Sequence, residues 1–114
     1  MAVDAGAGAL RIAHVDDHET VQLGFAFLLA DQPDITLVSS AFTVDDLVPR
    51  LGEIDLVVLD IRLSDGSTIE RNLALLQQHD ARVLAFTAAD NPAELRAASR
   101  AGVLGIVRKS ESRD

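Results

Sequence analysis

The 114-residue chain contains no cysteine. Disulfide bridges, thiol chemistry and zinc sites built from thiolates are therefore excluded. No apolar run approaches the roughly 20 residues that a membrane-spanning helix requires, so we expect no membrane segment. The Ala- and Gly-rich start, residues 1–8, has neither the basic region nor the apolar core of a signal peptide. We expect this start to be a flexible lead-in and the protein to be cytoplasmic.

Positive charge is also scarce, because 10 Lys and Arg residues stand against 18 Asp and Glu residues, for a formal net charge of −8. Such a balance disfavours non-specific binding to nucleic acid or to anionic lipid, and it fits a domain that meets a cation or a basic partner. A hydrophobic fraction of 48% indicates a folded core. The length is that of one domain.

Short apolar runs alternate with amphipathic stretches along the chain, which predicts βα units around a parallel sheet. The runs are nearly continuous in apolar residues, as is typical of strands covered by helices on both faces. His14 lies inside the first run and is expected to be structural. The predicted strands are Leu10–Val15, Ile35–Ser40, Leu56–Asp60, Val83–Thr87 and Leu104–Val107.

Four helices are predicted between these strands from apolar spacing and capping residues. The first covers about Glu19–Ala30, with His18 and Glu19 in its first turn, and is expected to turn Val21, Phe25, Leu28 and Leu29 inward. The second begins after Thr43 and is limited or kinked by Pro49. The third covers about Thr68–Gln78, with Ile69, Leu73 and Leu76 inward. The fourth starts at Pro92, with Asp90 or Asn91 as its cap, and stops at Gly102.

After the fifth strand the alternation stops, because residues 110–114 include no apolar side chain. A doubly wound sheet needs a helix over its last strand. We therefore expect residues 9–110 to form the folded domain and residues 111–114 to be a truncated tail. Either the chain is a fragment, or another chain covers the sheet through a homodimer or a partner protein.

Polar side chains follow four of the predicted strands. Asp16-Asp17, Asp60, Thr87 and Lys109 lie at strand ends or within two residues of them. In a parallel α/β sheet, ligands bind beyond the carboxyl ends of the strands. The pattern predicts an acidic pocket that holds a metal ion and accepts a phosphoryl group.

Each of these residues also has a simpler explanation when it is taken alone. The Asp16-Asp17 pair precedes a helix, where Asp is a common N-cap. Asp60 could serve only to turn the chain, and Thr87 is a good strand former. Lys109 could be a solvated side chain. The four together are harder to ascribe to chance than any one of them.

Four segments resemble the receiver domain of two-component response regulators, and the loop Leu63–Ser67 resembles its NarL/FixJ-type branch. The resemblance covers about residues 10–110. It implies a flavodoxin-like (CheY-like) doubly wound sheet of five parallel strands in the order 2-1-3-4-5, here without the C-terminal fifth helix. The segments are His14–Glu19, Val57–Leu63, Val83–Ala88 and Gly105–Lys109.

The resemblance also implies roles for single residues. Asp60 would accept the phosphoryl group from a histidine kinase. Mg²⁺ would be the cofactor, bound by Asp60, directly by Asp17, through a water by Asp16, and by the backbone carbonyl of Arg62. Thr87 and Lys109 would contact the phosphoryl group, the former by hydrogen bonding and the latter by charge.

At the level of the whole protein, the resemblance implies a signalling protein that is not an enzyme. It would regulate transcription in the full-length protein and bind DNA only through a C-terminal helix-turn-helix domain absent from this chain. Ile106 departs from the family, which usually has Tyr or Phe as the switch residue there. Ser64 stands where the family often has Pro, so we expect a looser turn.

Two alternatives stay open. The first is a degenerate receiver that acts as a phosphorylation-independent interaction module, as Ile106 and the missing helix would allow. The second is a nucleotide- or flavin-binding enzyme on a flavodoxin-like sheet. Against the second, the loop Asp16–Glu19 has no glycine to cradle a phosphate.

Overall fold

The computed structural model describes residues 9–61, 63–87 and 92–108. Five parallel strands form one sheet in the order β2-β1-β3-β4-β5, which confirms the predicted fold. Each strand end lies within one residue of its predicted position. The strands are β1 (Leu10–Val15), β2 (Ile35–Ala41), β3 (Leu56–Leu59), β4 (Arg82–Thr87) and β5 (Gly105–Arg108).

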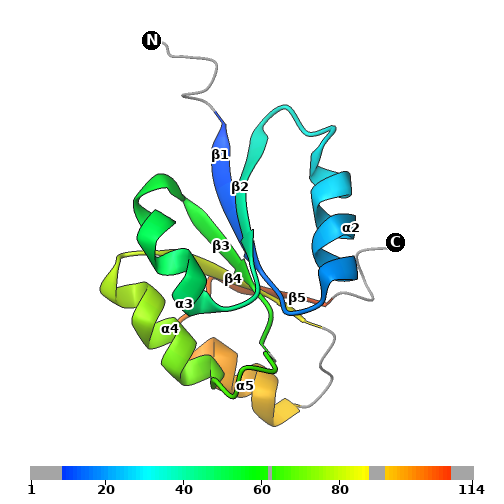
Figure 1. Ribbon diagram of the computed structural model, residues 1–114. Coiled ribbons are helices and arrows are strands. Elements are labelled where there is room, and N and C mark those ends of the chain that lie inside the picture. The colour runs from blue at the N-terminus through cyan, green and yellow to red at the C-terminus, as the bar shows by residue number, and fades with distance from the viewer. Residues whose placement is uncertain (1–8, 62, 88–91, 109–114) are drawn as a thin grey trace.

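The helices lie on both sides of this sheet, with α2 on one side and α3, α4 and α5 on the other (Figure 1). This arrangement follows from the parallel connections, each of which must cross a face of the sheet. The helices are α2 (Glu19–Leu29), α3 (Val44–Leu47), α4 (Ile69–Gln78) and α5 (Pro92–Arg100), and a 3-10 helix (Val48–Glu53) follows α3.

Local chemistry explains where α3 and α4 begin and why α3 is short. The Thr43 hydroxyl accepts a hydrogen bond from the Asp46 N–H at 3.1 Å, and Thr68 does the same for Arg71 at 3.1 Å. Thr43 is the N-cap that its spacing to Asp46 predicts, and Thr68, predicted as the first residue of its helix, is the N-cap instead. Pro49 limits α3 as expected, because the chain tightens into the 3-10 helix from Val48 onward. The predicted caps of α5, Asp90 and Asn91, lie outside the described residues.

The main core lies between the sheet and α3, α4 and α5. Strand residues that alternate along β1, β3 and β4 point into it, among them Val15, Leu59 and Ala85. From α4, the predicted residues Ile69, Leu73 and Leu76 are all buried, which confirms the inward face of that helix.

The α2 face of the sheet is covered less completely. The His14 ring is buried there and packs at a tilted angle against Phe25, with ring centroids 4.3 Å apart, and its Nε2 lies 3.9 Å from Asp16 Oδ2. The structural role expected for His14 stays a prediction. Leu28, predicted to point inward, is exposed, as are Leu23 and Phe27. The helix meets the sheet through Val21, Phe25 and Leu29, and Leu28 lies about 100° around the helix from Leu29.

No helix in the described ranges is long and apolar enough to cross a membrane.

Candidate metal centre

The carboxyl ends of β1 and β3 bring two acidic residues to the same edge of the sheet. The Asp16 N–H donates to the Ala41 carbonyl at 3.0 Å, and the Asp60 N–H donates to the Val15 carbonyl at 2.9 Å. Both bonds continue the strand pairing by one residue beyond the strands. The backbone positions of Asp16 and Asp60 are therefore fixed by the sheet itself.

Four side chains form an acidic cluster at this edge. One ligand atom from each of Asp16, Asp17, His18 and Asp60 lies within 4.8 Å of the others. Asp60 is only 3% exposed and Asp16 is fully buried. Carboxylates gathered in a buried place repel one another, and a cation lowers that cost. Oxygen donors at this spacing fit a hard divalent ion such as Mg²⁺.

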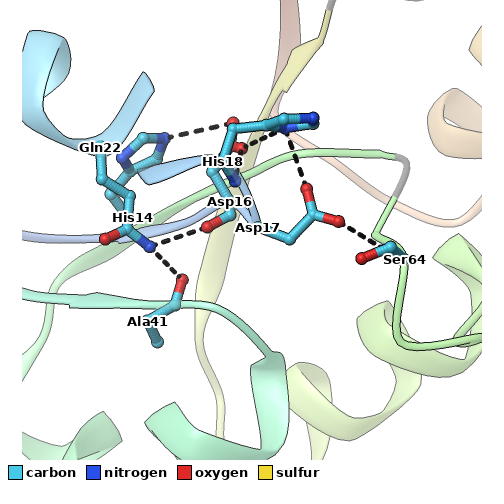
Figure 2. A network of polar contacts seen from close by, with 7 residues as sticks. All are labelled: His14, Asp16, Asp17, His18, Gln22, Ala41 and Ser64. Atoms are coloured by element: carbon cyan, nitrogen blue, oxygen red, sulfur yellow. Dashed lines mark hydrogen bonds and ion pairs between the residues drawn. The ribbon is translucent and has the colours of Figure 1, made fainter. Parts of the chain in front are cut away.

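His18 covers the exposed side of the cluster. Its Nδ1 lies 3.1 Å from Asp16 Oδ1 and 3.0 Å from Asp17 Oδ1, and its backbone N–H donates to Asp16 Oδ1 at 2.9 Å (Figure 2). The sequence placed His18 only at the start of the first helix. Its contact with both carboxylates was missed, although the Asp-Asp-His run was the available signal.

Asp17 is held from the loop that follows β3. The Ser64 N–H donates to Asp17 Oδ2 at 2.7 Å (Figure 2). Hydrogen bonding from Ser64, first from its side chain and then from its backbone, lowers the pKa of Asp17, and the neighbouring His18 lowers it further. Asp17 is therefore kept ionised, which is the form that binds a cation.

The second oxygen of Asp17 supports the same conclusion. Asp17 Oδ1 is buried, and no residue in the described ranges makes a hydrogen bond to it. Its contact with His18 Nδ1 has the distance of an ion pair without the geometry of a hydrogen bond. A buried carboxylate oxygen in this position has lone pairs available for a metal ion.

Ser64 restrains the turn through its backbone, and the looser turn expected at this position stays a prediction. Its N–H ties the turn to Asp17, a bond that proline could not make because proline has no backbone N–H. Gln22, which the sequence analysis did not single out, adds a second tie. Its Nε2 donates to the carbonyls of Asp16 at 2.7 Å and Ala41 at 2.9 Å, so α2 is fastened to the ends of β1 and β2.

The other predicted site residues are only partly placed. Thr87 is buried at the end of β4. Ile106 in β5 pairs with Ala85 of β4 and is half-buried against the main core. Arg62 and Lys109 lie outside the described residues.

Known proteins share this sequence pattern. The response regulator receiver domain family matches residues 12–114. The chain is 35% identical over 103 residues to the DNA-binding transcriptional activator DevR/DosR of Mycobacterium tuberculosis, a match that covers 88% of this chain and 48% of that protein. It is 29% identical over 101 residues to the response regulator GacA of Pseudomonas viridiflava, covering 83% and 47%. The chain spans about half the length of these relatives.

Solved structures share the fold. A LuxR-family two-component response regulator from Aurantimonas sp. is 32% identical with a TM-score of 0.77, and the match covers 90% of this chain and 75% of that one. The receiver domain of NarL from Mycobacterium tuberculosis superposes with a TM-score of 0.78 over 89% and 84% of the two chains, at 24% identity, and supports the fold alone.

These matches also correct one expectation from the sequence, that of a signalling protein that is not an enzyme. Receiver domains are phosphoryl-accepting signalling domains, so the expectation that the chain is not an enzyme was wrong, although the match names no enzyme class. The family match, the fold and the acidic cluster agree, and the chain belongs to the response regulator receiver domain family.

Proposed function

We propose that this receiver domain takes a phosphoryl group from a histidine kinase onto Asp60 in a Mg²⁺-dependent reaction. The observation that carries the proposal is the position of Asp60, buried at the end of β3 with oxygens of Asp16 and Asp17 within 4.8 Å. Three carboxylates held this closely make a site for a divalent cation beside a nucleophile. Residues 9–110 are the proposed receiver unit.

Asp16, Asp17 and Asp60 would hold Mg²⁺, with the Arg62 carbonyl as the fourth protein ligand expected from the sequence. Asp17 would bind directly and Asp16 through a water. When bound, the ion supplies positive charge that offsets the carboxylates and the oxygens of the incoming phosphoryl group.

The chain's own residues supply the remaining chemistry. An Asp60 carboxylate oxygen forms a bond to phosphorus while the bond between phosphorus and the kinase histidine breaks, and that electron pair returns to the histidine nitrogen. Such transfers depend mainly on positioning and charge. The backbone bond from Asp60 to Val15 fixes the nucleophile. Thr87 would donate its hydroxyl hydrogen to a phosphoryl oxygen, and Lys109 would pair with the phosphoryl charge.

Phosphorylation adds charge and acceptor oxygens at Asp60, which can draw Thr87 toward the site and change the β4–β5–α5 surface. We propose that this surface controls a dimer or partner contact. The relative DevR/DosR is a DNA-binding transcriptional activator about twice as long as this chain. By analogy, a longer protein containing this receiver would regulate transcription through a C-terminal helix-turn-helix domain.

One observation favours a second candidate, a receiver that acts by protein interaction without phosphorylation. Ile106 has no hydroxyl and is half-buried against the core, so it cannot report on Thr87 as a tyrosine would.

Phosphate uptake separates the two candidates. The protein is incubated with Mg²⁺ and a small phosphodonor, and its intact mass is followed. The proposal expects one phosphoryl group on wild type and on Asp46→Asn, an exposed-carboxylate control, and none on Asp60→Asn. No uptake by folded wild type, where a reference receiver reacts, would rule out the phosphoacceptor and favour the interaction module.

A further inference from the structure

Asn72 is a polar side chain on the buried face of α4. It is fully buried, and the other buried residues of this helix are apolar: Ile69, Leu73 and Leu76. An amide removed from water costs free energy unless it makes hydrogen bonds. The hydrogen-bond partners of Asn72 therefore indicate the structural role of this buried side chain.

Both ends of the Asn72 amide are used. Its Nδ2 donates to Ser67 Oγ at 2.9 Å, and its Oδ1 accepts from Arg71 Nη1 at 3.1 Å. Arginine can only donate, so the amide oxygen must face Arg71 and the amide nitrogen must face Ser67. The chemistry of the partners fixes the orientation of the amide.

Ser67 connects the Asn72 amide to the loop between β3 and α4. Its hydroxyl accepts from Asn72 and donates to Asp65 Oδ1 at 2.5 Å, and its N–H donates to the same oxygen at 2.9 Å. These two bonds also lower the pKa of Asp65, so the accepting carboxylate stays charged. Hydrogen bonds within residues 65–67 thereby close a tight turn, and the bond from Asn72 to Ser67 connects this turn to α4.

The two ends of the network lie on different elements. Ser64, the residue before Asp65, donates to Asp17 in the acidic cluster. At the other end, Arg71 contacts both carboxylate oxygens of Asp45 in the first turn of α3, at 2.6 and 3.0 Å. Continuous polar contacts and one peptide bond thus connect α3 to the acidic cluster through Asn72.

We propose that Asn72 is a positioning residue of the metal centre. Through Ser67 and Asp65 it holds the β3–α4 loop where the Ser64 N–H bonds to Asp17, and the geometry of Asp17 in turn sets the affinity for the cation. Partners that orient metal ligands from outside the ligand set commonly change metal affinity by about 10- to 100-fold when they are removed. The part of this inference that concerns Mg²⁺ rests on the proposed function.

Two variants remove different groups from the hydrogen-bond network of Asn72, Ser67 and Asp65. Asn72→Leu replaces the amide with an apolar group of similar size, and Ser67→Ala removes the hydroxyl at a half-buried position. The first readout is the Ser64 amide proton in the metal-free protein, which lies downfield while it bonds to a carboxylate. The second is the Mg²⁺ affinity measured by calorimetry.

Each variant is expected to move the Ser64 amide signal upfield and to weaken Mg²⁺ binding by about tenfold. The double variant is expected to lose little more than either single variant, because both break the same chain of bonds. Ser67→Thr keeps the hydroxyl, so its Ser64 amide signal and its Mg²⁺ affinity are expected to stay near those of wild type. Leu76→Val, a core change in the same helix, is the matched control and should leave the Ser64 signal in place.

Unchanged Ser64 signals in folded Asn72→Leu or Ser67→Ala would overturn the proposal, as would fully additive losses of affinity. If Asn72→Leu does not fold, Ser67→Ala and Ser67→Thr decide alone. If wild type binds no Mg²⁺, the proposed function fails, while the metal-free Ser64 signal still decides whether Asn72 positions the loop.

Discussion

The Ser64 backbone N–H donates a 2.7 Å hydrogen bond to Asp17 Oδ2, across 47 residues of sequence. This bond joins the loop after β3 to the loop after β1, so the nucleophile proposed at Asp60 and the metal ligand proposed at Asp17 belong to one connected unit. The same bond helps to keep the Asp17 carboxylate charged. A serine at this position thus contributes to the acidic cluster through its backbone.

Asp17→Asn is expected to weaken Mg²⁺ binding by roughly tenfold or more, because an amide supplies no negative charge to the cation. Calorimetric titration of the folded variant with Mg²⁺ measures this loss. Asp34→Asn removes the same charge from an exposed site near β2 and should bind Mg²⁺ like wild type. Equal affinities for Asp17→Asn and wild type would remove Asp17 from the metal site.

The edge of the sheet away from this cluster carries a separate acid-sensitive pair. Arg11 donates from Nε and Nη2 to the two oxygens of Asp55 at 3.1 and 3.0 Å, and its N–H donates to Asp55 at 2.9 Å. Hydrogen bonding from the Arg11 side chain, then from its backbone, lowers the pKa of Asp55. In the unfolded chain the pKa of Asp55 is about 3.9, and in the folded protein it is lower. The stability from this pair is therefore fully present above about pH 3.9 and is lost as the pH falls through the lower pKa of the folded protein.

Thermal unfolding of Asp55→Asn against wild type tests this expectation. The variant should melt below wild type at pH 6, and the difference should shrink as the pH falls below about 3.9. Because both side chains are exposed, salt should also reduce the difference. A difference that grows on acidification would show that the charge of Asp55 is not stabilising, and Asp31→Asn controls for the loss of one charge.

Much of the fold could be predicted from the sequence, because the elements have local causes. Strands buried on both faces give continuous apolar runs, and Thr43 and Thr68 cap their helices through side chains three residues from the bonded N–H. The positions of Asp16 and Asp60 also followed, since parallel strands end at a common edge.

The remaining features depend on contacts that spacing cannot show. Leu28 is as apolar as Leu29, and only the location of the sheet decides which of them is covered. Asn72 could not be singled out from the sequence, because its partner Ser67 lies in a loop whose path is set by tertiary structure. The contact between Ser64 and Asp17 likewise needs the fold to bring two loops together.

Two leucine substitutions compare how much the buried face of α4 and the exposed face of α2 contribute to stability. Leu76→Ala in α4 is expected to lower the free energy of unfolding by about 2–5 kcal/mol, because the side chain is 0% exposed. Leu28→Ala in α2 is expected to change it by only about 0.5 kcal/mol, because that side chain is 59% exposed. Urea unfolding followed by circular dichroism measures both values. A large loss for Leu28→Ala would mean that α2 is covered in solution.

Mapping the phosphorylated residue tests the central claim most directly. Protein treated with Mg²⁺ and a small phosphodonor is digested under conditions that preserve acyl phosphates, and the modified peptide is sequenced by mass spectrometry. The phosphoryl group is expected on Asp60, and omitting Mg²⁺ should abolish the modification. A phosphoryl group on another residue, or equal labelling of Asp60 without a divalent cation, would contradict the account.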